Sequence, residues 1–520
     1  MKGGEIIAAV EEERINRIKY APGQLPELAI REALKIGGIS MNDVDIIATH
    51  GETWGDDFGF WLIDYIKYNF GHCPEIRRIN HHDAHAASAF YASGFDKAMI
   101  ITVDASGDGV SAQFSVGQDG MITLKDRINR PDSLGIFYSA MTQYCGFRRD
   151  SDEYKLMGLA AYGNPDRYDL SDFLSFGKGR ITLNTEYLKP IKPGQSQPVR
   201  QNMAFSDKLI EKLGPKRLKH EPITQHYMDV AASAQKLLEQ ALVDMVTHFH
   251  KETGLEKLCM AGGVALNCMA NKHLMNLPFI DDIFIQPAAG DAGVSLGAAM
   301  WTAVENGFRV KALKHVFLGS SFTNDEIEKS LKGIGISYKR LNNPAIYAAE
   351  MIAGNKIIGW FQGATEFGPR ALGNRSILSN PAQPDMKAVL NAKIKHREPF
   401  RPFAPSLIVE DTDIFFSGKK KESPFMTINY DAKKGVEQKI PSVVHEDGTS
   451  RIQTVSRSEN PLYYELLTEM KRLTGMGVVV NTSFNVDMQP IVNTPEEAVS
   501  TFFGCGMDAL IIGSFLVEKK

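Results

Sequence analysis

Several features are scarce in this chain, and each absence excludes a class of protein. Only five cysteines occur in 520 residues, widely spaced and without a CxxC pair. This spacing argues against a disulfide framework or a thiolate zinc site and favours a reducing compartment. No apolar run approaches the roughly 18 residues of a membrane span. The apolar run at Ile6–Val10 is too short for a secretion signal, so we expect a cytoplasmic protein with no membrane association.

An excess of positive charge is also missing. The 58 Lys and Arg residues are outnumbered by 62 Asp and Glu, giving a net charge of −4. A nucleic-acid partner held by a general basic surface is therefore not expected, and any phosphate binding must be local. The P-loop, the GxGxxG fingerprint and the HExxH zinc-protease motif are all absent.

Strand and helix patterns alternate along both halves of the chain. Residues 96–125 predict strand, turn and strand, and 225–251 have the apolar spacing of a helix. KLCMAGG and DIFIQPAAG each predict a strand that runs through glycine into a helix. The polar stretch 316–343 is the predicted junction between domains. This alternation predicts an α/β protein.

The second half of the chain shows the same alternation of helix and strand signals. Asn343 and Pro344 are the expected cap and first turn of a helix, which is followed by the strand KIIGWF. GVVV predicts another strand, Thr494-Pro495 starts a helix, and DALIIGSFLV is predicted to close the chain as a strand.

Positive charge is concentrated in one short segment. Between Arg370 and Arg401 there are seven Lys and Arg residues against two acids, with glycines and prolines interspersed. Arginine beside backbone-restricting residues suits a rigid, bidentate grip on phosphate or carboxylate oxygens. The alternative is a basic surface loop.

His81 and His85 stand four residues apart in an alanine-rich, helix-prone stretch. At this spacing both imidazoles project from one helix face and could bind one metal ion. Asp104 and Asp291 each follow an apolar strand and enter a glycine turn, a position that commonly faces a ligand. Two histidines and two aspartates suit Fe(II), Zn or Mn. The alternative is that each aspartate only initiates a turn.

The sequence AGGVALN places Gly262, Gly263 and Asn267 where a strand runs into a helix. Exposed backbone amides at such a point could hold a phosphate or an adenosine group. Tight packing is the usual alternative explanation for paired glycines.

Together, these ordered segments resemble the NodU/CmcH carbamoyltransferase family over essentially the whole chain. The segments that carry the resemblance are EIIAAVEEERINRIKY, NHHDAHAASAF, VDASGDG, SLGIFYSAMTQYCGF, EYKLMGLAAYG, AGGVALN, PAAGDAG, EFGPRALGNRSIL, KHREPFRPFAPSL, EDGTSRIQTV and NTSFN.

The resemblance implies two fused domains. Residues 1–325 would be an actin/Hsp70-like (Kae1-like) part with two subdomains, and 340–520 a YrdC-like α/β part. The YrdC-like part would make carbamoyl adenylate from carbamoyl phosphate and Mg-ATP. The Kae1-like part would pass the carbamoyl group to a hydroxyl of a small molecule or sugar, the two sites sharing a water-poor chamber. A tRNA carbamoyl-type modification enzyme is the rival activity.

The resemblance also assigns roles by position. Lys19 would lie near the reacting carbamoyl group, and Lys19, Lys395, Arg451 and Ser483 would be catalytic. The metal ligands would be His81, His85, Asp104 and Asp291, with Fe(II) preferred over Zn or Mn. The substrate- and nucleotide-binding set would be Gly135, Gly262, Gly263, Asn267, Arg370, Arg375, Lys395, Arg401, Arg451, Asn481 and Ser483.

Three further expectations concern what varies within the family. Members usually begin with an additional strand and a histidine-containing turn, which should pair with residues 5–10 in the first sheet. We therefore expect the natural start to lie upstream of Met1; the alternative is an impaired protein that binds nucleotide or metal without turnover. Asp108 and His82 are candidates for the general base. Acceptor specificity is expected in loops at 52–75 and 188–225.

Overall fold

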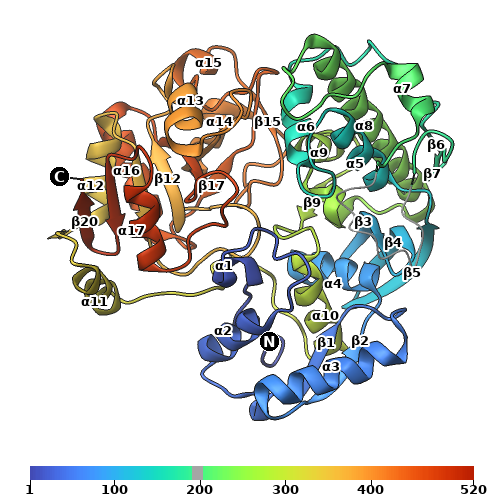
Figure 1. Ribbon diagram of the computed structural model, residues 1–520, viewed down its shortest axis with the longest axis horizontal. Coiled ribbons are helices and arrows are strands. Elements are labelled where there is room, and N and C mark those ends of the chain that lie inside the picture. The colour runs from blue at the N-terminus through green and yellow to red at the C-terminus, as the bar shows by residue number, and fades with distance from the viewer. Residues whose placement is uncertain (190–202, 520) are drawn as a thin grey trace. The chain divides into compact units, whose positions relative to one another are not determined.

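The computed structural model describes residues 1–189 and 203–519, and they divide into two compact units (Figure 1). We call Ile46–Ile63 with Glu75–Ala312 the histidine unit, and Met1–Asp45, Asp64–Pro74 and Leu313–Lys520 the arginine unit. The first 45 residues thus group with the C-terminal part of the chain. The functional domains expected at 1–325 and 340–520 remain predictions. The mixed α/β class is confirmed.

The histidine unit is organised around a five-stranded sheet of order β5-β4-β3-β8-β9. Strands β3, β4 and β5 form an antiparallel meander, whereas β8 and β9 continue the sheet in parallel with β3. The strands of this unit are β1 (Ile46–Thr49), β2 (Glu75–Arg78), β3 (Lys97–Gly107), β4 (Val110–Gln118), β5 (Met121–Asn129), β6 (Leu174–Gly177), β7 (Arg180–Leu183), β8 (Lys257–Ala261) and β9 (Asp282–Ile285).

Helices cover both faces of this sheet because alternate strand residues are apolar on each side. Helix α4 packs Ala86 and Phe90 against Ile100 and Ala261. On the opposite face Phe249 of α8 contacts Phe114, with ring centroids 5.5 Å apart. The helices are α3 (Gly55–Phe70, which crosses into the other unit), α4 (His81–Ser93), α5 (Leu134–Tyr144), α6 (Glu153–Ala160), α7 (Asp207–Leu213), α8 (Gln225–Thr253), α9 (Cys268–Met275) and α10 (Ala292–Glu305).

The arginine unit contains a mixed eight-stranded sheet of order β10-β20-β19-β11-β12-β18-β13-β17 and a three-stranded sheet β14-β15-β16. Its strands are β10 (Lys339–Arg340), β11 (Ile358–Phe361), β12 (Arg375–Ser379), β13 (Ala404–Ile408), β14 (Phe416–Ser417), β15 (Tyr430–Ala432), β16 (Thr449–Ser450), β17 (Gln453–Val455), β18 (Val478–Ser483), β19 (Ala509–Ile512) and β20 (Phe515–Glu518).

Helices α12 and α16 pack side by side and bury a shared apolar core with the large sheet. The helices of this unit are α1 (Glu12–Asn16), α2 (Glu27–Gly37), α11 (Asn324–Ile334), α12 (Pro344–Ala353), α13 (Met386–Val389), α14 (Thr412–Phe415), α15 (Val436–Lys439), α16 (Pro461–Thr474) and α17 (Pro495–Phe503), and a π-helix follows α13 at Leu390–Lys395.

Most of the predicted elements are present. Asn343 caps α12 by accepting hydrogen bonds from two backbone amides, as its position before Pro344 predicted. DALIIGSFLV is a hairpin of β19 and β20 rather than one strand, because the chain reverses at Gly513 with a φ of +53°.

Two further predictions about local structure are wrong. Residues 6–10 form no strand; instead the segment docks in the arginine unit, where the Ala9 amide donates to the Leu318 carbonyl at 3.1 Å. The predicted loop at 52–75 is mostly the helix α3. Residues 190–202 of the other predicted acceptor loop lie outside the described residues. Among the described helices, none combines the length and apolarity needed to cross a bilayer.

Candidate metal centre and anion site

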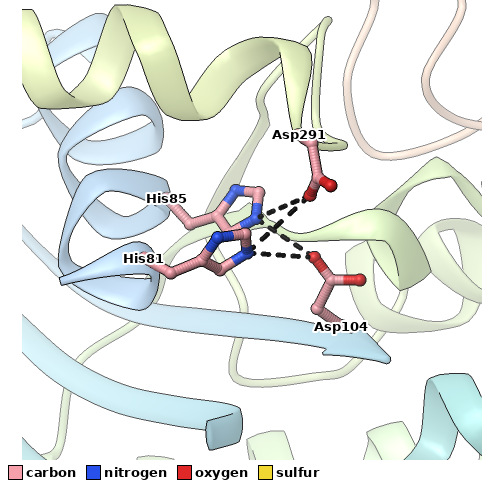
Figure 2. Close-up of side chains that lie close together, drawn as sticks. All are labelled: His81, His85, Asp104 and Asp291. Atoms are coloured by element: carbon pink, nitrogen blue, oxygen red, sulfur yellow. Dashed lines mark hydrogen bonds and ion pairs between the residues drawn. The ribbon is translucent and has the colours of Figure 1, made fainter. Parts of the chain in front are cut away.

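Helix α4 presents His81 and His85 on the same side of the helix. The side chain of Asn80 caps the helix, accepting a hydrogen bond from the His82 amide at 3.1 Å. Alanines then fill the helix face that packs on the sheet. The side chains of His81 and His85, separated by one turn, therefore project together toward Asp104 of β3 and Asp291 at the start of α10 (Figure 2).

The four predicted ligands lie close together, as Figure 2 shows. One donor atom from each of His81, His85, Asp104 and Asp291 lies within 4.8 Å of the others. Asp104 Oδ2 is 3.1 Å from His85 Nε2 and 3.5 Å from His81 Nε2. Asp291 Oδ1 is 3.7 Å from His81 Nε2 and 3.9 Å from His85 Nε2.

This donor set fits a divalent transition metal. Ligands held 2.0–2.2 Å from an ion at tetrahedral to octahedral angles stand roughly 3.0–3.5 Å apart, close to the spacings of this cluster. Two imidazoles with two carboxylates suit Fe(II), Zn or Mn better than Mg or Ca. His85 is fully buried, and three of the four side chains are held by packing, so the site is largely preformed.

The pKa shifts show how strongly these groups interact. Burial would lower the pKa of His81, but the hydrogen bond to Asp104 and the charge of Asp291 outweigh it and raise that pKa. Burial would raise the pKa of Asp104, yet hydrogen bonds with His81 and His85 hold it well below its ordinary value. The Asp104 carboxylate is therefore already ionised and available to a cation.

His82 points away from the cluster, and the structure argues against it as a general base. Its Nδ1 lies 2.7 Å from Thr102 Oγ1 and its Nε2 lies 3.1 Å from the Val110 carbonyl, so both nitrogens are engaged. Burial lowers the pKa of His82 to about 3. Asp108, the other candidate, accepts hydrogen bonds from Thr53 Oγ1 at 2.7 Å and the His81 amide at 2.9 Å.

The predicted glycines pack around Asp104, which lies inside β3, where its pairing with β4 is interrupted, rather than in a turn after the strand as predicted. A Cβ on Gly135 would lie 2.6 Å from the Ala105 amide nitrogen, and one on Gly262, where φ is +93°, would lie 2.2 Å from the Val103 carbonyl oxygen. Gly263 faces Asp104 itself, and a Cβ there would lie 3.0 Å from Oδ1. Close packing explains Gly135 and Gly262 directly. The Asn267 side chain caps α9 through the Ala270 amide and pairs with Gln235.

In the arginine unit, the π-helix brings Lys395 to the end of β18. The Lys395 ammonium, 2% exposed, donates to the Ser483 carbonyl and hydroxyl and to Asn485, whose carbonyl and Oδ1 lie 3.0 and 2.9 Å away. Ser483 Oγ in turn donates to Asn485 Oδ1 at 2.7 Å. Asn485 was missed as a site residue, although it ends the motif NTSFN.

Other cations surround Lys395. Burial lowers the pKa of Lys395 well below its ordinary value, and the charges of Arg397, Arg401 and Lys19 lower it further. Arg401 lies 3.7 Å from Glu398 and 3.8 Å from Asp487. Lys19 comes from the N-terminal segment, and burial also lowers its pKa. Lys395 is buried, whereas Lys19, Arg397 and Arg401 are partly exposed, and a bound anion would relieve the repulsion among these like charges.

The loop that carries Arg370 is fixed on both sides. Glu366 Oε1 accepts from the amides of Leu372 and Asn374 at 2.7 and 2.9 Å. From the N-terminal segment, the buried Arg14 donates to the Gly368 carbonyl at 2.7 Å. Arg370, in this loop, is partly exposed.

Two members of the predicted binding set have structural contacts instead. The Arg375 guanidinium is 0% exposed and donates to the carbonyls of Gln362 at 2.6 Å and Ser320 at 3.1 Å. The Asn481 side chain is buried and bonds Ser406 Oγ at 2.9 Å. These contacts argue against a direct role for either residue in nucleotide binding. Arg451 differs, because its Nε is buried without a hydrogen-bond partner among the described residues.

Comparison with known proteins identifies relatives of the whole chain. Residues 63–300 match the family "Carbamoyltransferase N-terminus" and 349–519 match "Carbamoyltransferase C-terminus". An uncharacterized protein of Synechocystis is 37% identical over 100% of this chain and 94% of its own length. Nodulation protein NolNO of Sinorhizobium fredii is 37% identical over 100% of this chain and 78% of its own. Nodulation protein NolO of Bradyrhizobium diazoefficiens is 38% identical over 85% and 79%.

Proposed function

Since this chain belongs to the NodU-type carbamoyltransferase family, we propose that it is an ATP-dependent O-carbamoyltransferase that uses carbamoyl phosphate. The activity would proceed through a carbamoyl adenylate and carbamoylate a hydroxyl of a small molecule or sugar. The observation that carries this proposal is the group of cations around the buried Lys395. It lies in a different compact unit from the cluster of His81, His85, Asp104 and Asp291.

In the first step, water releases phosphate from carbamoyl phosphate, and an oxygen of the resulting carbamate attacks the α-phosphorus of ATP. A P–O bond forms and pyrophosphate leaves. Lys395, Arg401 and Arg370 would bind these anions, and their charge would stabilise the negative charge that develops as pyrophosphate departs. We place this step in the arginine unit, which we propose to be YrdC-like.

In the second step, the acceptor hydroxyl oxygen attacks the carbamoyl carbon, the C–O bond to AMP breaks, AMP leaves as an anion, and the hydroxyl proton is released to solvent. We place this step in the histidine unit, whose meander continued by parallel strands supports the Kae1-like assignment. His81, His85, Asp104 and Asp291 would hold a divalent metal, Fe(II) in preference to Zn or Mn, which polarises the carbamoyl oxygen when bound. Asp108 and Thr53 lie next to His81 and would order the approach of the acceptor.

The test is release of pyrophosphate from Mg-ATP in the presence of carbamoyl phosphate. Lys395→Ala should reduce this rate at least about 100-fold, because a buried donor at the departing phosphates is lost. Lys393→Ala is the matched control: Lys393 belongs to the same π-helix but is exposed, so its loss should leave the rate within about twofold. Equal losses in both variants, or no carbamoyl-phosphate-dependent pyrophosphate from the native protein, would contradict the proposal.

A further inference from the structure

Arg17 joins the N-terminal segment to the C-terminal part of the arginine unit. Its guanidinium donates two hydrogen bonds to consecutive carbonyls, from Nη1 to Ile491 at 2.6 Å and from Nη2 to Pro490 at 3.0 Å. Nη1 also lies 3.2 Å from a carboxylate oxygen of Glu497 in α17. A planar guanidinium suits such paired acceptors because its donors have a fixed geometry.

The loop that Arg17 holds, residues 485–491, also holds Lys395. The side-chain amide of Asn485 donates to the Gln489 carbonyl at 2.7 Å, next to the carbonyls that Arg17 binds. Asn485 Oδ1 and the Asn485 carbonyl accept hydrogen bonds from the Lys395 ammonium at 2.9 and 3.0 Å. A continuous series of contacts therefore runs from the Arg17 guanidinium through this loop to Lys395.

The middle of this loop is irregular and exposed. Its residues belong to no helix or strand, and Met488 is 48% exposed. At the base of the loop, the Val492 amide donates to the Phe484 carbonyl at 3.0 Å. Irregular, exposed loops open easily unless they are anchored, and Arg17 provides an anchor close to Asn485.

The backbone around Arg17 adopts an unfavourable conformation. Arg17, Tyr20 and Ala21 have φ angles of +63°, +65° and +40°, in the left-handed region that residues with a side chain rarely occupy. Such conformations persist where the surrounding contacts impose them, and they are commonest at functional sites. The same turn carries Lys19, where burial lowers the pKa and the charge of Arg401 lowers it further. The turn thus places Arg17 beside one of the cations near Lys395.

We propose that Arg17 is a positioning residue for Lys395. By holding the loop 485–491, Arg17 keeps both oxygens of Asn485 on the ammonium and so fixes the ammonium beside the departing phosphate group. This inference rests on the proposed function. Arg17 makes no contact with substrate in this role, because its donors are engaged by the two carbonyls and Glu497. Misplacing a group at the reacting centre by about 1 Å can cost on the order of 100-fold in rate, so the support of Lys395 matters.

A simple electrostatic role is the alternative, in which Arg17 only adds positive charge near a bound anion. A lysine keeps that charge, but it lacks the planar fork that binds two consecutive carbonyls. Glycine removes both the charge and the hydrogen bonds, and it tolerates a φ of +63° without strain. Arg17→Lys therefore separates hydrogen bonding from charge, and Arg17→Gly gives the full loss.

The experiment compares the full chain with these two variants in three measurements. They are calorimetry of inorganic phosphate binding, kcat for carbamoyl-phosphate-dependent pyrophosphate release, and hydrogen exchange of the amides in the loop 485–491. We expect both variants to bind phosphate at least about fivefold more weakly, to lose at least about tenfold in kcat and to exchange the loop amides at least about tenfold faster.

Arg31→Ala is the matched control. Arg31 also lies in the N-terminal segment, forms an ion pair with Glu27 at 2.8 Å and donates to the Asn69 carbonyl at 3.0 Å. It has no part in the loop 485–491, so all three values should stay within about twofold of those of the native protein.

The outcomes separate this inference from the proposed function. Native phosphate affinity and native kcat in Arg17→Lys would assign the effect of Arg17 to charge and overturn the positioning role. Unchanged exchange of the loop amides in Arg17→Gly would also overturn it, as would a melting temperature lowered by more than about 10 °C in both variants, which indicates general loss of folding. If the native protein releases no pyrophosphate, the proposed function alone fails, because phosphate binding and loop exchange still report on Arg17.

Discussion

In the histidine unit, two buried imidazoles share the Asp104 carboxylate, whereas in the arginine unit the buried ammonium of Lys395 is held by uncharged oxygens and has further cations nearby. His81, His85 and Asp104 are joined by hydrogen bonds, and the pKa of Asp104 is held low by them. The pKa of Lys395 is lowered by burial and by neighbouring arginines.

This difference indicates opposite ligands. Histidines that are hydrogen-bonded to a carboxylate can give up a proton and bind a metal cation in its place without large movement of the side chains. A group of like charges instead gains most from an incoming anion. The proposed function assigns one step of the reaction to each unit, so changes that affect only one unit can be used to test that division.

The largest expected effect comes from removing a metal ligand. Asp104→Asn should reduce carbamoyl transfer to an acceptor at least about 100-fold, because the amide is a poor replacement for a carboxylate ligand. Pyrophosphate release should stay within about threefold, since the cations of the arginine unit are untouched. Mass spectrometry of the product and a pyrophosphate assay measure the two steps. Asp119→Asn, in the exposed turn between β4 and β5, is the control. If carbamoyl transfer and pyrophosphate release fell together, the two steps could not be assigned to separate units.

Two arginines of one motif should respond differently within the arginine unit. Arg375→Gln should lower the free energy of unfolding by about 3 kcal/mol, because several buried carbonyls lose a charged donor. Arg370→Gln, at a partly exposed position, should change stability by less than about 1 kcal/mol but weaken binding of carbamoyl phosphate. Denaturant unfolding and calorimetry check the pair. Equal stabilities would show that Arg375 has been assigned the wrong role.

Substitution of Gly107, which packs against the His81 ring, should have a smaller effect. A Cβ on Gly107 would lie 2.0 Å from the His81 ring, so Gly107→Ala should displace that imidazole. We expect affinity for Co²⁺, a spectroscopic probe, to fall about tenfold, which is the usual scale for disturbing the support of a ligand. Gly120→Ala, at an open turn position, controls for added backbone strain. Unchanged cobalt spectra in Gly107→Ala would contradict the position of His81.

The smallest effects are those of pH, and they should have opposite signs in the two units. His81 must lose its proton to bind a metal, and its pKa is raised above 6.5, so Co²⁺ affinity should fall as pH decreases from neutral, up to about tenfold per pH unit. Lys395 holds an anion only while charged, and its pKa lies below 10.5, so phosphate binding should weaken as pH rises toward that value. Titrations of each ligand across about pH 6 to 9.5 test this. Cobalt binding that strengthens on acidification would contradict the assignment.

Local sequence patterns predicted the elements well. The cap at Asn343, the long helix from Gln225 and the strands after Lys97 follow from residue preferences that operate within a few positions. The pairing of His81 with His85 is equally local, because helix geometry alone puts them on one face. The segment at 6–10 was mispredicted because its backbone is held within the arginine unit, through the Ala9 amide, instead of joining a sheet.

Long-range contacts separate the roles of individual charged residues. Nothing local distinguishes Arg370 from Arg375 in EFGPRALGNR, yet one is partly exposed and the other is surrounded by backbone carbonyls. The part played by Asn485 depends on Lys395, 90 residues earlier in the chain.

Residue types and short spacings predicted the α/β class and the four side chains able to hold a metal, and the resemblance of the ordered motifs indicated the family. Tertiary contacts were needed to show that the N-terminal segment with Lys19 joins the cations of the arginine unit, and that Arg17 of the same segment is linked to Lys395 through the loop 485–491. Both are contacts between segments distant along the chain, and their energies depend on burial and packing that no short stretch of residues contains.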